Sequence, residues 1–294
     1  MSQSDEIEDS AAPLIEHLAE LRTRLIRALL AFAIAICLFF VPIQNDFVAE
    51  HVMRYLLDPV VETLRNLGDP DPRFQYTNPT EYLFTLFRVS MVGGFAIAFP
   101  VIGFQLWRFV APGLYRTEKN AFLPFLLASP AMFILGACFA QFVVTPLAMT
   151  FLLGFADFPS LIAGGAATAP NEQADFVFQG KVNESLDITL KFILAFGLCF
   201  QLPVLLTLMG KAGLVSKDGL INVRKYAVVG ILVLAALVTP PDVITQIILF
   251  VVVYGLYEVS IFLVGRVERK REAELREQGF YDDEDEEDLG DDPA

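Results

Sequence analysis

The chain has 294 residues, of which 55% are hydrophobic and 19% are charged, and its mean hydropathy is +0.54. This composition is too apolar for an ordinary water-soluble domain and indicates a protein that lies in a lipid bilayer. The formal net charge of −14 says little about the membrane part, because many of the carboxylates fall between Asp282 and Asp292, close to the end of the chain.

Six stretches without a charged residue predict six membrane-spanning helices and an all-α fold. A helix needs about 18 to 20 mainly apolar residues to cross a hydrocarbon core about 30 Å thick, and the first four stretches are long enough. The fifth and sixth are shorter and meet at a Thr-Pro-Pro-Asp sequence, which predicts short spans joined by a tight hairpin. The stretches are 28–45, 89–107, 120–156, 192–210, 226–241 and 243–257.

The distribution of basic residues predicts the orientation in the membrane. Of the 21 lysines and arginines, fifteen lie before the first stretch, after the sixth, or in the connections that follow the second and fourth. The other six lie in or beside the connections that follow the first and third. Because cytoplasmic loops carry an excess of Lys and Arg, both termini are expected in the cytoplasm, with helical loops on the periplasmic side.

Composition divides the chain into three parts. Residues 1–12 form an acidic segment that we expect to be disordered, and residues 13–266 form the membrane domain. Residues 267–294 form a charged, mostly disordered cytoplasmic tail, since they have too little apolar surface to offset the entropy of ordering.

Two proline-containing pairs in the first outer connection predict helix starts. Asp58-Pro59 and Asn78-Pro79 each place a favourable N-cap residue directly before a proline, which is the arrangement common at the first turn of a helix. Pro59 is therefore expected to begin a second helix in this connection and to have a structural role.

The sequence contains no motif for a catalytic or metal-binding centre. A GxxxxGK[ST] phosphate loop, an HExxH pair and a GxSxG elbow are absent, and the only histidines, His17 and His51, lie outside the predicted spans. The three cysteines form no CxxC pair. We therefore expect no enzyme activity and no cofactor, metal or nucleic-acid partner.

The segment before the first span predicts an amphipathic cytoplasmic helix. Glu20 and Arg24 lie one turn apart and favour an ion pair, which contributes about 0.3 to 0.5 kcal/mol when exposed. The apolar face carries Leu14, Leu18, Leu21 and Leu25, and the polar face carries Glu16, Glu20, Arg24 and Arg27.

Gln201 lies near the middle of the fourth stretch. An unpaired amide is costly at this depth, so the side chain is expected to have a hydrogen-bonding partner. Pro203 lacks an N–H and leaves the carbonyl of Cys199 without its usual donor, which predicts a local polar break in the helix. Simple hydrogen bonding between helices is the competing role for this glutamine.

Four motifs follow one another along the chain: HLAELRTRL at 17–25, FQLWRFVAPGLYRTEKN at 104–120, FGLCFQLP at 196–203 and VTPPDVITQ at 238–246. Together with the six-span layout they resemble the TatC family, the signal-peptide receptor of the twin-arginine translocase. The resemblance implies binding of Arg-Arg signal peptides of folded proteins at the cytoplasmic face. It also implies an oligomeric complex with single-span TatA and TatB subunits in the bacterial cytoplasmic membrane, and export driven by the proton gradient.

The resemblance further implies roles for individual residues. The carboxylates that bind signal peptides in the family match Glu20 and Glu118. A guanidinium presents a planar fork to a carboxylate, so two such acceptors can distinguish paired arginines from lysines. The other residues that match this surface are Arg22, Arg24, Phe109, Pro112, Leu114 and Tyr115.

A second set of polar residues matches the part of the family that binds the partner subunits, with ordinary hydrogen bonding inside the bundle as the alternative. This set is Gln141, Gln201, Thr239, Asp242 and Gln246. TatC relatives commonly carry glutamate where this chain has Gln201, so we expect the amide to form hydrogen bonds rather than to carry a proton.

A small-solute secondary transporter or channel is the alternative function, and a scaffold without receptor activity is a third. A transporter predicts charged residues at the middle of the membrane or an inverted repeat. Neither is evident in the sequence.

Overall fold

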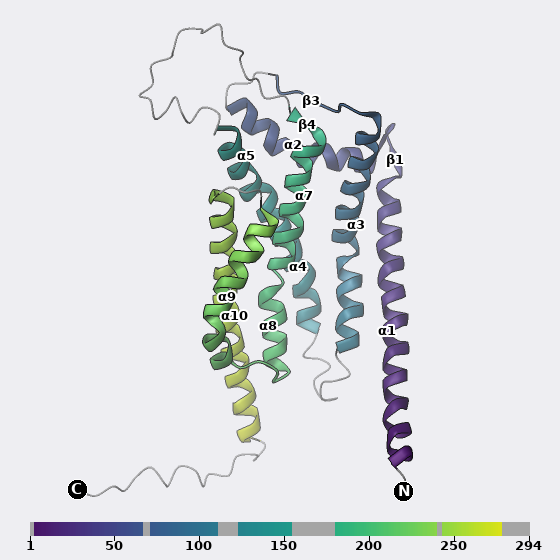
Figure 1. Ribbon diagram of the computed structural model, residues 1–294, viewed down its shortest axis with the longest axis vertical. Helices are drawn as coiled ribbons and strands as arrows, with labels where there is room; N and C mark the ends of the chain where they lie inside the picture. The colour runs from purple at the N-terminus through teal and green to yellow at the C-terminus, as the bar shows by residue number, and fades with distance from the viewer. Residues whose placement is uncertain (1–2, 67–70, 111–122, 155–179, 240–242, 278–294) are drawn as a thin grey trace, which may run out of the picture.

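The computed structural model describes residues 3–66, 71–110, 123–154, 180–239 and 243–277, and most of them are helical. The long helices run side by side, and α2 lies across one end of the bundle (Figure 1). The helices are α1 (Gln3–Phe39), α2 (Val48–Asn66), α3 (Pro79–Val110), α4 (Leu123–Phe139), the π-helix η3 (Ala140–Val144), α5 (Thr145–Gly154), α7 (Val182–Cys199), α8 (Leu202–Lys211), α9 (Lys217–Val238) and α10 (Val243–Glu277). The strands are β1 (Pro42–Ile43), β2 (Asp46–Phe47), β3 (Phe74–Gln75) and β4 (Gly180–Lys181).

Five segments of the described chain are long and apolar enough to cross a membrane. They are Pro79–Leu106, Leu127–Gly154, Val182–Lys211, Lys217–Val238 and Val243–Ala273. Helix α1 packs along α3 and supplies a sixth long helix beside them (Figure 1). The prediction of an all-α membrane protein is confirmed.

Helices α1 and α3 approach closely because glycine lies at their contact. A Cβ atom on Gly94 would lie 3.1 Å from the backbone nitrogen of Ile36, which is tighter than a side chain ordinarily packs. The rings of Phe32 and Phe95 meet edge to face in the same interface, with their centroids 6.2 Å apart. This antiparallel packing places residues 21–28 of α1 beside residues 102–106 of α3.

The two ends of the bundle differ in what they contain. The beginning of α1, the end of α3, the connection between α8 and α9, and the end of α10 lie at one end (Figure 1). Helix α2 lies at the other end together with the antiparallel β1–β2 hairpin and the parallel β3–β4 pair. The first and last helices therefore have their outer termini on the same side, as an even number of spans requires.

The hairpin of α9 and α10 stops well before the ends of α5 and α7 on the α2 side (Figure 1). At the opposite end, both helices continue past their uncharged stretches, since α9 begins at Lys217 and α10 ends at Glu277. Helix α1 begins at Gln3.

The prediction that Asp58-Pro59 starts a new helix is wrong, because α2 continues through Pro59. Pro59 provides no N–H for the carbonyl of Tyr55, one turn earlier. The side-chain amide of Gln141 in η3 supplies the missing donor: its Nε2 lies 3.3 Å from the oxygen of Tyr55 and 3.2 Å from that of Leu56. A side chain from a distant helix therefore lets α2 remain unbroken.

The prediction at Asn78-Pro79 is confirmed, because α3 begins at Pro79. The Oδ1 atom of Asn78 accepts a hydrogen bond from the backbone N–H of Thr80 at 3.2 Å. The Oε2 atom of Glu81 accepts one from the N–H of Thr77 at 2.9 Å. Side chains on both sides of the helix start thus accept hydrogen bonds from backbone N–H groups at and just before the first turn.

Candidate functional site

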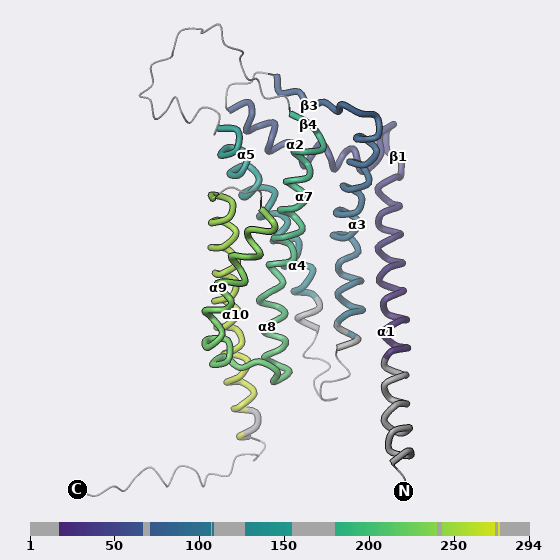
Figure 2. Tube along the Cα trace, viewed as in Figure 1, coloured from purple at the N-terminus to yellow at the C-terminus, as the bar shows by residue number. Residues whose placement is uncertain are grey.

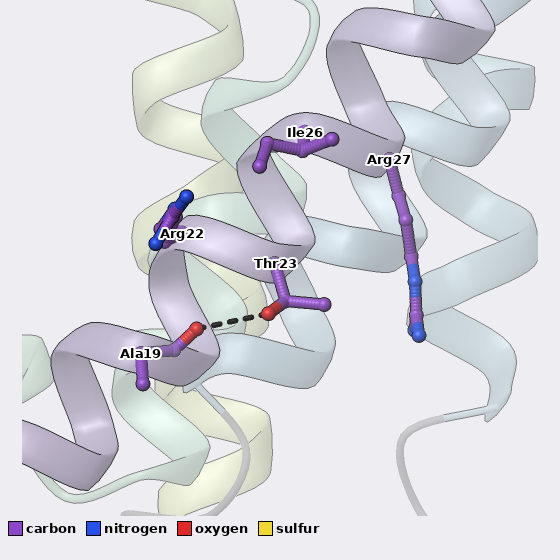
Figure 3. Close-up of a pocket in the computed structure, with 5 residues that line it drawn as sticks. All are labelled: Ala19, Arg22, Thr23, Ile26 and Arg27. Atoms are coloured by element: carbon purple, nitrogen blue, oxygen red, sulfur yellow. Dashed lines mark hydrogen bonds between the residues drawn. The ribbon is translucent and has the colours of Figure 1, made fainter.

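Helix α1 presents basic side chains on two faces near its middle. Arg22 and Arg27 extend from different sides of the helix, with Thr23 and Ile26 between them (Figure 3). These side chains and Ala19 line a surface hollow of about 450 Å³. The hydroxyl of Thr23 donates to the carbonyl of Ala19, one turn earlier in the same helix, at 3.0 Å.

Glu20 and Arg24 form the ion pair that their spacing predicts. The Oε1 atom of Glu20 accepts a hydrogen bond from Nε of Arg24 at 3.1 Å and another from Nη2. The Glu20 side chain remains 39% exposed, whereas that of Arg24 is only 10% exposed. The Glu20 carboxylate therefore binds one guanidinium and is still partly exposed at the protein surface.

Arg24 is buried because it points toward α3. It shares a cavity of about 120 Å³ with residues of both helices, including Gln105 of α3. Gln105 is not among the residues predicted for this surface, although an amide within the apolar stretch 89–107 was a usable signal. The structure adds this residue to the site because α1 and α3 pack in antiparallel directions.

Several residues assigned to this surface by resemblance lie outside the described residues. They are Pro112, Leu114, Tyr115 and Glu118, and the same holds for Asp242 of the second polar set. Phe109 belongs to the last turn of α3. The last turns of α3 lie at the same end of the bundle as the connection between α8 and α9 (Figure 2).

Gln201 has a reciprocal partner on a neighbouring helix. Its Nε2 donates to the carbonyl of Ser129 at 2.7 Å, and the Ser129 hydroxyl donates to its Oε1 at 3.0 Å. Helix α7 ends at Cys199 and α8 begins at Leu202, so the break that Pro203 predicts is confirmed. The amide thus joins α4 to the point where the fourth span is interrupted.

The remaining polar residues have separate surroundings. Gln141 bonds to α2, as described above, and the hydroxyl of Thr239 donates to the carbonyl of Ala235 in its own helix at 2.9 Å. Gln246 is half-buried on α10. Among the hydrogen bonds between described residues, none connects Gln141 with Thr239 or Gln246.

Comparison with known proteins places this arrangement in a family. The model of TatC, Sec-independent protein translocase protein, matches residues 16–251. The TatC protein of Aquifex aeolicus (strain VF5) is 38% identical over 264 residues, which cover 90% of this chain and 99% of that protein. The TatC protein of Magnetococcus marinus is 38% identical over 274 residues, covering 93% of this chain and 92% of the relative.

Solved structures agree with the sequence relatives. A crystal structure of the twin-arginine translocase receptor TatC matches with a TM-score of 0.68 and 38% identity, covering 85% of this chain and 99% of that one. A second, in DDM, gives a TM-score of 0.69. Since family model, relatives and structures agree over most of the chain, this protein belongs to the TatC family of Sec-independent protein translocase proteins.

Proposed function

We propose that this translocase subunit is the receptor that binds Arg-Arg signal peptides of folded proteins, with Glu20 and Glu118 as the two acceptors. The observation that carries the proposal is that Glu20 already binds a guanidinium and is still exposed. Its carboxylate accepts two N–H groups from the guanidinium of Arg24 and remains 39% exposed. The site thus has the chemistry to receive a guanidinium and room for one to approach.

The proposal places the end of the bundle that holds the beginning of α1 in the cytoplasm of a bacterial cell. The fifteen-to-six distribution of basic residues supports this orientation. Arg22 and Arg27 would lie at the membrane surface, where their charges attract anionic lipid headgroups. Phe109, Pro112, Leu114 and Tyr115 would complete the binding surface next to Glu118.

Assembly with TatA- and TatB-type subunits belongs to the same proposal. The outer end of the bundle offers buried polar groups on η3 and beside the α9–α10 hairpin, among them Gln141 and Thr239. Because this hairpin stops short of α5 and α7 (Figure 1), it would favour locally thinner bilayer around it. Such thinning suits passage of folded proteins, energised by the proton gradient.

Site-specific photocrosslinking tests the receptor proposal. A photoreactive residue at position 20 or 118 should crosslink to a precursor with an Arg-Arg signal, and conversion of the signal to Lys-Lys should abolish the crosslink. Position 38 is the matched control, because Leu38 is 51% exposed on the same helix near its opposite end. Crosslinks of equal yield at all three positions, or none with the Arg-Arg precursor, would rule the proposal out in favour of a solute transporter or a scaffold.

A further inference from the structure

The contact between α1 and α3 beside Glu20 contains a small cavity that is bordered by apolar residues and two polar residues. Its volume is about 120 Å³, and its lining residues are Leu21, Arg24, Leu25, Ala28, Ile102, Gln105 and Leu106. Five of these side chains are hydrocarbon. The space between the helices is therefore almost entirely apolar, and Arg24 and Gln105 are the two residues beside it that carry polar side-chain groups.

One donor and one acceptor are unused in this contact between α1 and α3. The Nη1 atom of Arg24 and the Oε1 atom of Gln105 are both buried, and neither has a hydrogen-bonding partner within the described part of the chain. Buried polar groups are rarely left unpaired, because they lose water without gaining a protein partner. The two residues come from opposite helices and border the same cavity, so a turn of the Arg24 side chain within this contact could bring the donor to the acceptor.

Arg24 also restricts what Glu20 can do. Both of its bonds to Glu20 end on Oε1, so this oxygen is already crowded. A guanidinium that binds a carboxylate through two parallel N–H···O bonds needs both oxygens. An incoming arginine can therefore form that fork on Glu20 only after Arg24 has moved away from Oε1.

We infer that Gln105 is the second acceptor for Arg24 and that Arg24 moves between Glu20 and Gln105. In the free protein Arg24 occupies Glu20 in place of the peptide. When a peptide arginine takes the carboxylate, Arg24 turns into the cavity and its Nη1 donates to Oε1 of Gln105. This inference rests on the proposed function, since it assumes that Glu20 receives a guanidinium from the signal peptide.

The chemistry of the cavity explains why Gln105 matters. A guanidinium released among leucine, isoleucine and alanine side chains would have no acceptor, which disfavours its release. The side-chain carbonyl oxygen of Gln105 supplies this acceptor. Gln105 is thus a positioning residue that acts through Arg24, and it makes Glu20 available without touching the peptide.

Two substitutions at position 105 should have opposite effects on binding of a labelled Arg-Arg signal peptide to the purified full-length protein. Gln105→Leu removes the acceptor and should weaken binding roughly tenfold, the range for one hydrogen bond to a charged group. Gln105→Glu offers Arg24 a carboxylate, frees Glu20 in advance, and should strengthen binding severalfold. Ile102→Val changes the same cavity without changing an acceptor and should leave binding unaltered.

Gln105→Leu and Gln105→Glu, repeated in an Arg24→Gln background, test whether Gln105 changes peptide binding through Arg24. If Gln105 acts through Arg24, both effects should disappear in that background. The inference would be overturned if either substitution still changed peptide affinity in the Arg24→Gln background. It would also be overturned if Gln105→Leu and Gln105→Glu changed the affinity of the otherwise wild-type protein in the same direction. Gln105→Met provides a second apolar variant in case Gln105→Leu does not fold.

A Lys-Lys peptide separates this inference from the receptor proposal. If the wild-type protein binds Arg-Arg and Lys-Lys peptides equally, the receptor proposal fails whatever position 105 does. If the wild type prefers Arg-Arg but position 105 has no influence, only the inference about Gln105 fails.

Discussion

Gln141 donates its side-chain amide to the carbonyl of Tyr55, the backbone group that Pro59 leaves without a donor inside α2. The two residues are 86 positions apart in the chain. This bond ties the helix that lies across the end of the bundle to the third span.

The Gln141–Tyr55 bond predicts a stability effect that depends on Pro59. Gln141→Leu should lower the free energy of unfolding by about 1 to 3 kcal/mol, because the half-buried Tyr55 carbonyl, which Pro59 leaves without its helical donor, loses this hydrogen bond. Pro59→Ala restores a backbone N–H for Tyr55. In that background the loss from Gln141→Leu should be clearly smaller, as measured by thermal unfolding in detergent. Equal losses in both backgrounds would show that Gln141 acts by packing alone.

Gln201 predicts a difference between a polar and an apolar replacement. Gln201→Glu should preserve export of an Arg-Arg reporter protein, because the Ser129 hydroxyl can still donate to a carboxylate oxygen. Gln201→Leu should reduce export or assembly, since both groups of Ser129 lose a partner. The Ser129→Ala variant serves as the control for the lost hydroxyl. Wild-type export by Gln201→Leu would mean that the amide only fills space in the bundle.

The two proposed acceptors predict a loss that depends on the peptide. Glu118→Gln and Glu20→Ala should each weaken binding of an Arg-Arg signal peptide by roughly 10-fold to 150-fold, since a hydrogen bond to a charged group contributes about 1.5 to 3 kcal/mol. A Lys-Lys peptide lacks the guanidinium fork and should lose much less. Titration of both peptides against the inserted variants measures the difference, and equal losses would indicate general electrostatic attraction.

The proposed orientation predicts which positions a membrane-impermeant thiol reagent can reach from outside. Cysteines introduced at Asp69 and Gly165 should be labelled on intact cells, because they belong to the connections predicted to be periplasmic. Cysteines at Gly113 and Asp218 should be labelled only after the membrane is opened. External labelling at Gly113 would contradict the orientation with both termini inside.

Local patterns account for much of what could be predicted from the sequence. The positions of the long helices follow from uncharged stretches, the start of α3 from Asn78-Pro79, and the Glu20–Arg24 pair from a spacing of four residues. Each depends only on residues within a few turns of one another. The break before α8 was predictable for the same reason, because Pro203 removes a backbone donor from its own helix.

The partners of the buried polar side chains were decided by the tertiary structure alone. Gln201 meets Ser129, Gln141 meets Tyr55, and Arg24 faces the same cavity as Gln105 only because particular helices pack against each other. That packing also overrides the local preference at Pro59. Composition and helical periodicity thus determined which segments enter the membrane and which residues needed a partner, whereas the choice of partner depended on close approach of helices far apart in the chain.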